Sequence, residues 1–239
     1  MILAILQARM SSTRLPGKVL RPLAGAPMVL RQLERIGRAK RIDALVAATS
    51  QERSDDVLTE ILEHNGVRVF RGPLEDVLAR FVGALDEAGG ADHVVRLTAD
   101  CPFADPEVID AVIARHLESG ADYTSDTPAR RTFPKGLDCE AMTAAALRDA
   151  DAEAKEPDER EHVTPYIYRR PGRFSIASVD QDRDEGDVRW TVDTPEDYAF
   201  ASVVYDGLYP QTPAFTSDDV RAFVRARPEL HRYGGDRRI

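Results

Sequence analysis

The stretch MILAILQARMSSTRLPGK, residues 1–18, runs from an apolar segment directly into a loop rich in cations and hydroxyl groups. Residues 2–6 form a continuous apolar run of the length expected for a buried strand. The segment that follows carries Arg9, Arg14 and Lys18, with hydroxyl side chains between them. Two interpretations are open at this point: an ordinary solvated surface loop, or a loop that binds an anion such as phosphate, which arginine and lysine hold well.

The pattern begun by this first strand continues along the first half of the chain. Further short apolar runs predict strands at residues 44–50, 67–72, 93–100 and 122–126. Amphipathic segments between them predict helices at residues 27–39, 54–66, 74–89 and 105–120. Near-continuous apolar strands that alternate with helices indicate parallel βαβ units, with helices on both faces of the sheet. We therefore predict an α/β fold built on a mostly parallel sheet.

The pattern changes after residue 127. Residues 127–187 are rich in proline and charge, and we interpret them as an inserted segment of a single domain, 1–239. Such a segment would cover the sheet edge or supply a site for a second substrate. Within it we expect helices at 143–154 and 159–170 and a strand at 174–180. The expected elements that complete the chain are a strand at 188–194 and helices at 195–209 and 216–230.

Composition and charge argue against several classes of protein. No apolar run reaches the roughly 18 residues that a membrane-spanning helix needs. The formal net charge of −9 argues against a general nucleic-acid binder, although a local basic cluster can oppose the overall sign and bind a small phosphate ligand. The two cysteines, Cys101 and Cys139, have no zinc-site spacing, and the first residues lack the basic region of a signal peptide. We expect a cytoplasmic protein.

Two aspartates follow predicted strands and are candidates for a metal site. In open parallel sheets, ligands bind outside the carboxyl ends of the strands, and carboxylates hold hard divalent cations. Asp100 closes the fourth predicted strand, and Asp193 follows the strand-like stretch VRWTV. Asp100 could instead cap a turn, although Asp105 is the better helix cap, and Asp193 could cap the helix that starts near Pro195. The residues alone leave both alternatives open.

The first loop matches neither of the common phosphate-binding fingerprints. GxGxxG is absent, and the second predicted strand ends in Ala-Thr-Ser rather than in an acidic residue. The pair Gly17-Lys18 lacks the upstream glycine and the following serine or threonine of a Walker loop. What remains is a basic, hydroxyl-rich turn that leads into a helix and could surround a triphosphate.

Six motifs occur in the order QARMSSTRLPGKVLRPLAGAPM, VFRGPLEDVLARF, VVRLTADCPFADPEVID, GLDCE, EREHVTPYIY and WTVDTPEDY. Together they resemble the cytidylyltransferase family, which includes the acylneuraminate and 3-deoxy-manno-octulosonate cytidylyltransferases. They are most similar to its spore coat polysaccharide biosynthesis protein F branch, and the match spans essentially the whole chain. The resemblance implies a Rossmann-like sheet of the nucleotide-diphospho-sugar transferase type, in an enzyme that binds CTP and Mg²⁺.

The resemblance also implies roles for individual residues. Arg9 and Lys18 correspond to the basic residues that hold the triphosphate, and Asp100 and Asp193 to the metal-binding carboxylates. Arg9, Lys18 and Asp100 are then the catalytic residues. Further nucleotide contacts are implied for Ser12, Thr13, Arg14, Arg71, Asp76, Arg80 and Thr98. The implied reaction is attack of an acceptor oxygen on the α-phosphorus of CTP, with release of pyrophosphate.

The acceptor side is less well specified. The resemblance implies a small acidic acceptor, such as a ulosonic or nonulosonic acid, and contacts from Glu140, Arg160, His162 and Tyr166. His162 and Tyr166 are alternatively ordinary residues of an amphipathic helix with polar tips. The pair Thr13-Arg14 stands where the sialic-acid enzymes carry Lys-Gly, so the identity of the acceptor stays open. Family members are often dimers built through the inserted segment, so a homodimer is expected.

Two other functions are consistent with such a sheet. A glycosyltransferase that consumes a nucleotide-sugar usually carries a DxD-type motif after the fourth strand, but TADCPFAD has no aspartate two residues from Asp100. A non-catalytic nucleotide-binding protein predicts decay of the basic loop or of the carboxylates. Arg9, Lys18, Asp100 and Asp193 are all present, which favours the cytidylyltransferase.

Overall fold

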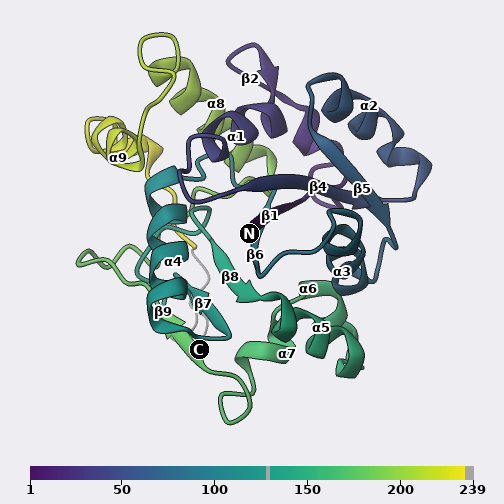
Figure 1. Ribbon diagram of the computed structural model, residues 1–239. Coiled ribbons are helices and arrows are strands. Elements are labelled where there is room, and N and C mark those ends of the chain that lie inside the picture. Colours follow the sequence, from purple (N-terminus) through teal and green to yellow (C-terminus); the bar gives the residue numbers. More distant parts are fainter. Residues whose placement is uncertain (128–129, 235–239) are drawn as a thin grey trace.

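The chain folds around a mostly parallel sheet, shown in Figure 1 in a computed structural model that describes residues 1–127 and 130–234. Within these residues the sheet has seven strands in the order β5-β4-β1-β6-β8-β7-β9. Their bounds are β1 Ile2–Gln7, β4 Ala44–Ser50, β5 Arg68–Gly72, β6 His93–Thr98, β7 Tyr123–Ser125, β8 Glu140–Thr143 and β9 Ile176–Ser178. β1 pairs in parallel with β4 and β6, and β8 runs antiparallel to both β6 and β7. A separate short hairpin joins β2 (Pro22–Leu23) to β3 (Ala26–Pro27).

Helices cover both faces of the sheet, because successive residues of a strand point to opposite sides. Leu3 and Ile5 of β1 face one apolar core, to which α3 (Val77–Glu87), α5 (Ala144–Glu153) and α7 (Pro165–Tyr168) contribute. Ala4 and Leu6 face the other core, which contains residues of α1 (Met28–Ile36), α2 (Asp56–His64) and α4 (Pro106–Ser119). The predicted fold class is confirmed.

A third apolar cluster lies beside the sheet, where α8 (Pro195–Leu208) and α9 (Ser217–Arg225) pack around Phe103, Trp190 and Phe215. The 3₁₀ turns are η1 (Lys18–Leu20), η2 (Arg53–Asp55) and η3 (Pro228–Leu230). No helix within residues 1–127 and 130–234 is long and apolar enough to cross a membrane.

Two element predictions in the second half are wrong. The helix expected at 159–170 is interrupted at Val163, whose positive φ of 71° separates α6 (Pro157–His162) from α7. Residues 188–194 are not a strand and form only isolated bridges. The physical reason is that their N–H groups reach other partners, because Trp190 donates to the Lys135 carbonyl and Val192 to the Asp100 carbonyl.

The segment 127–187 does more than cover the sheet edge. It supplies β8, which the sequence pattern did not reveal, and β9. β8 inserts between β6 and β7, so residues distant in the chain become neighbours of the strand that ends at Thr98. The segment therefore builds part of the sheet edge at which ligands are expected.

Candidate active site

The loop after β1 is held in a tight curve by its own backbone and by a buried carboxylate. The N–H groups of Ser12 and Gly17 both donate to the Met10 carbonyl, at 2.9 and 3.0 Å. The Met10 N–H donates to Oδ1 of Asp55 at 2.7 Å, and Asp55 is fully buried. Gly17 has a φ of +67°, which favours glycine, and η1 begins at the next residue, Lys18. Lys18 is therefore attached to a turn whose course these bonds determine.

Asp100 follows β6 and does not cap the next helix. Asp105 caps α4, because its Oδ1 accepts the Glu107 N–H at 2.9 Å. Its other oxygen accepts the Ser217 N–H at 2.7 Å. The Asp100 carboxylate contacts side chains instead, with its Oδ2 at 3.2 Å from Lys18 Nζ. Asp100 is thus available for a role other than capping, as the position of Asp105 indicated.

Asp193 is not a helix cap either. The cap of α8 is Thr194, whose Oγ1 accepts the Asp197 N–H, while the Asp197 carboxylate accepts the Thr194 N–H in return. The Val192 N–H donates to the Asp100 carbonyl at 2.8 Å, so the segment that carries Asp193 is tied to the end of β6. The two aspartates are brought together by this bond, although 92 positions separate the backbone groups that make it.

Gly136 permits the close packing of the segment that precedes Asp193. Its φ is +114°, and a Cβ there would lie 2.6 Å from the Thr191 nitrogen and 2.8 Å from the Trp190 carbonyl carbon. The neighbouring Lys135 carbonyl accepts the N–H groups of Trp190 and Thr191 at 2.7 and 3.0 Å. A larger residue at 136 would displace residues 190–191 and move Asp193 with them.

The ammonium group of Lys18 bridges the two carboxylates. Lys18 Nζ lies 3.2 Å from Asp100 Oδ2 and 2.9 Å from Asp193 Oδ1, and it donates to the Val192 carbonyl at 2.7 Å. Burial acts to lower the pKa of Lys18, but attraction to Asp100 and Asp193 outweighs it, and the pKa is raised. Burial acts to raise the pKa of Asp100, but Lys18 reverses this and the pKa is lowered. Lys18 and Asp100 are therefore both charged at neutral pH.

These groups line a cavity of about 310 Å³ at the carboxyl ends of β1 and β6. Its size is at the lower end of the range for small-molecule sites. Of the residues singled out in the sequence, the cavity is lined by Arg9, Ser12, Thr13, Arg14, Lys18, Thr98, Asp100, His162 and Asp193. Cations from the first loop and carboxylates from two distant segments thus face one opening.

Comparison with known proteins identifies the family. The family model described as "Cytidylyltransferase" matches residues 3–216, which is most of the chain. The chain belongs to the cytidylyltransferase family. The six motifs of the sequence therefore carry a resemblance that is confirmed.

Individual relatives support this assignment. The chain is 40% identical over 235 residues to the spore coat polysaccharide biosynthesis protein SpsF of Bacillus subtilis (strain 168), which covers 95% of each chain. It is 34% identical over 199 residues to a 3-deoxy-manno-octulosonate cytidylyltransferase of Anaeromyxobacter dehalogenans (strain 2CP-C), over 78% of this chain and 81% of that one. A solved cytidylyltransferase from Leptospira borgpetersenii serovar Hardjo-bovis (strain JB197) has a TM-score of 0.91 at 31% identity, over 98% of both chains.

Three residues to which the cytidylyltransferase resemblance gave nucleotide contacts lie outside the lining of this cavity. Arg80 is fully buried, and its guanidinium donates to the Pro73 and Leu74 carbonyls. Burial lowers its pKa to about 10. Asp76 caps α3 and pairs with Arg160 at 2.7 Å. Arg71 pairs with Asp56 at 2.7 Å and donates to the Ser50 and Glu52 carbonyls. The structure gives these side chains partners that hold the fold.

The expected acceptor residues divide in the same way. Arg160 spans Asp76 and Asp151 on neighbouring helices, and Tyr166 donates to Glu153 at 2.6 Å, so neither lines the cavity. His162 does line it and is half-exposed. Glu140 is buried and accepts from Tyr123 at 2.5 Å and from Thr164 at 2.8 Å. Tyr166 therefore matches the alternative interpretation, in which it is an ordinary helix residue, and the partners of Arg160 are side chains of the fold.

A second cavity, of about 270 Å³, adjoins the first and shares Arg14, Arg96, Thr98, Asp100, His162 and Asp193 with it. It is also lined by Arg131, Lys135, Asp138 and Glu140. Sequence reasoning missed Arg96, Arg131 and Lys135. Arg96 had a usable signal, because it lies two residues before Thr98 on β6 and so on the same face of the strand. Arg131 and Lys135 lie in an irregular stretch with no period to indicate their direction.

The donor set at Asp100 and Asp193 fits a magnesium ion. One oxygen of each carboxylate lies close to Lys18 Nζ, at 3.2 and 2.9 Å. The two carboxylates therefore already stabilise a positive charge between them. Magnesium prefers oxygen ligands and is usually held by one or two carboxylates together with substrate phosphates and water. Within the described ranges no three His, Cys, Asp or Glu side chains form a metal cluster, so further ligands would have to come from a nucleotide and from water.

Proposed function

We propose that the protein transfers CMP from CTP to an acidic sugar, such as a ulosonic or nonulosonic acid, in the synthesis of a cell-surface polysaccharide or glycoconjugate. One observation carries the proposal: the first-loop cations and the two carboxylates converge on one cavity, where Lys18 contacts both Asp100 and Asp193. The names of the relatives support it, since one acts on 3-deoxy-manno-octulosonate and another belongs to polysaccharide synthesis.

The proposed reaction is a displacement at phosphorus. An acceptor oxygen attacks the α-phosphorus of CTP, a new phosphorus–oxygen bond forms, and the bond to the β-phosphate oxygen breaks. Pyrophosphate leaves with the electron pair, and the acceptor proton passes to water. Arg9 and Lys18 bind the charge that builds on the leaving group, which is the main contribution a protein makes to such transfers. Magnesium held by Asp100 and Asp193 would neutralise and orient the phosphates.

The acceptor binds in the second cavity in this proposal. Arg96, Arg131 and Lys135 line it beside Asp138 and Glu140, and arginine and lysine are the side chains that bind the carboxylate of an acidic sugar. His162 lies at the border that the two cavities share, where it can contact an acceptor that reaches the α-phosphate. As in its family, the enzyme would be a cytoplasmic homodimer, and light scattering on the purified protein tests the dimer.

The test is release of pyrophosphate from each nucleoside triphosphate with Mg²⁺ and a panel of ulosonic acids. We expect release with CTP and one or more acids, and its loss in Asp100→Asn, which keeps the side-chain shape but removes the charge. Asp206→Asn, on an exposed aspartate of α8 that lines neither cavity, is the matched control. Release that is unaffected by Asp100→Asn would refute the assignment of that residue. Turnover of a nucleotide-sugar without a triphosphate would favour the glycosyltransferase.

A further inference from the structure

Arg189 connects the candidate metal site to the start of α8. Its guanidinium Nη2 donates to Asp193 Oδ2 at 2.6 Å and to Asp197 Oδ2 at 3.1 Å. Its Nε donates to Asp197 Oδ1 at 3.2 Å. The Arg189 side chain is only 13% exposed, so both ion pairs are largely shielded from water. A planar guanidinium can span two carboxylates in this way because its donors point in fixed directions.

Asp197 is the anchor of this arrangement. It is 2% exposed, and its Oδ2 accepts the backbone N–H groups of Asp193 and Thr194, each at 3.0 Å. One carboxylate therefore fixes the backbone of Asp193 and also, through Arg189, its side chain. Burial acts to raise the pKa of Asp197, but the bonds from Arg189 and the backbone outweigh it and the pKa is lowered, so Asp197 stays charged.

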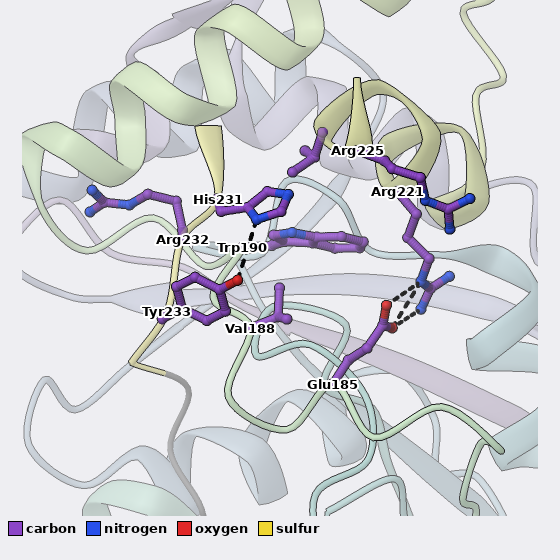
Figure 2. Close-up of a pocket in the computed structure, with 9 residues that line it drawn as sticks. Glu185, Val188, Trp190, Arg221, Arg225, His231, Arg232 and Tyr233 are labelled. Carbon is purple, nitrogen blue, oxygen red and sulfur yellow. Dashed lines mark hydrogen bonds and ion pairs between the residues drawn. The ribbon is translucent and has the colours of Figure 1, made fainter. Parts of the chain in front are cut away.

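The C-terminal segment supports Asp197 from the other side. Arg232 donates to Asp197 Oδ1 at 3.1 Å, and its carbonyl accepts the Arg189 N–H at 3.0 Å. Figure 2 shows the cavity of about 200 Å³ that this segment borders, with the Arg232 side chain turned away from Trp190. That cavity shares no lining residue with the two cavities at Asp193. Arg232 lines that cavity and also donates to the Asp197 carboxylate.

The two oxygens of Asp193 have different partners as a result. Oδ1 faces Lys18, on the side of Asp100, whereas Oδ2 faces Arg189 and, at 3.3 Å, Arg14. Arg14 is 63% exposed and lies in the first loop, so it holds Oδ2 weakly. Arg189 is the buried cation on Oδ2, and together with Lys18 on Oδ1 it determines the plane of this carboxylate.

We propose that Arg189 is a positioning residue for the divalent-cation site, which directs Asp193 Oδ1 toward the position beside Asp100. The proposal rests on the proposed function for the identity of the ion. A simpler role for Arg189, neutralising the excess negative charge, makes the opposite prediction. If charge alone mattered, removing Arg189 would strengthen cation binding, since the site would become more negative. If position matters, removing it weakens binding, because Asp193 can rotate.

The experiment is a titration of the purified protein with Mn²⁺, with and without CTP and with no acceptor, in which free Mn²⁺ is measured by electron paramagnetic resonance. We expect Arg189→Gln to raise the dissociation constant about tenfold or more, the usual effect of losing a residue that orients a metal ligand. Arg189→Lys keeps the charge but not the fork, and we expect an intermediate loss. Arg183→Gln, an exposed arginine paired with Asp218, is the matched control and should bind as the wild type does.

Equal or tighter Mn²⁺ binding by Arg189→Gln would overturn the proposal. Melting curves of each variant establish that the protein titrated is folded. If Arg189 were purely structural, its removal would lower stability without changing the affinity of the folded protein for Mn²⁺. The titration needs no turnover. A wild type that binds Mn²⁺ but releases no pyrophosphate would refute the proposed function and leave the role of Arg189 measurable.

Discussion

Two charged regions of this molecule differ in what their charged side chains face. Around the first loop, Lys18, Asp100 and Asp193 come from three separate segments and line an opening. Around α3, α5 and α6, Arg160 contacts both Asp76 and Asp151, and none of the three lines that opening. The difference teaches that residue type and motif do not separate a binding group from a structural one. What separates them is whether their partners leave room for a ligand.

Lys18→Met should give the largest effect that distinguishes the two regions. We expect kcat/KM for pyrophosphate release from CTP to fall by about 10²–10³, as when one donor to a developing negative charge is lost. The measurement is a steady-state assay, with circular dichroism to establish that the variant is folded. Lys155→Met, on an exposed lysine, is the control. Near-normal activity of Lys18→Met would show that the region around the first loop is not the active site.

Arg160→Ala should affect stability and not activity. The side chain makes two bonds to Asp76 and two to Asp151, three of them at 2.7 Å. Losing charged hydrogen bonds of this kind costs about 2 kcal/mol in the free energy of unfolding, measured with urea. Arg169→Ala, which breaks an exposed pair with Asp158, should cost much less. A large loss of activity with unchanged stability would contradict the division between the regions.

A histidine pair at the other end of β6, of which His116 is buried, tests whether polar groups away from the candidate site act through stability alone. His116 is 1% exposed, with its Nε2 at 3.0 Å from His93 Nδ1 and its Nδ1 at 3.1 Å from Thr124 Oγ1. Burial and then His93 lower the pKa of His116 to about 4. An unfolded histidine has a pKa near 6.5, so the unfolded state binds the extra proton between these values. The free energy of unfolding is therefore unaffected by this titration above about pH 6.5, and it falls as the pH drops toward 4.

Between pH 7.5 and pH 5 this histidine should cost the wild type about 2 kcal/mol of unfolding free energy. His116→Gln should lose less over the same interval, because it removes the titrating group. His64→Gln, on an exposed histidine, should keep the wild-type pH dependence. Urea denaturation at the two pH values measures all three proteins. An identical pH dependence in His116→Gln would show that another group is responsible.

Arg71→Gln should give the smallest effect, and it tests whether Arg71 is a structural residue or a nucleotide contact. Its ion-pair partner Asp56 is half-exposed, so we expect a loss of less than about 1 kcal/mol in stability. If the contacts in the structure describe its role, the KM for CTP is unchanged. A raised KM for CTP would instead support the nucleotide contact that the family resemblance implies.

Much of the fold could be predicted because its causes are local. The first strands and helices of the chain have clear apolar periods, and Asp105 and Gly120 mark the two ends of α4 as expected. β8 could not be predicted, since its residues pair only after the chain has returned to β6. The false strand at 188–194 has the same origin. Its residues read as β-formers, but their backbone partners are Lys135 and Asp100 rather than a strand.

The sequence by itself determined the family, the α/β architecture and the cations and carboxylates that line the candidate site, because motif order and period are properties of the chain. Only the tertiary structure decided which charged groups line the site. It gave Arg80 and Arg160 partners outside the first cavity, and it placed Arg96 and Lys135 in the lining of the adjoining one. It also made Arg189 the partner of Asp193. The physical reason is that a charge takes its role from its neighbours, and folding chooses those neighbours across long separations in the chain.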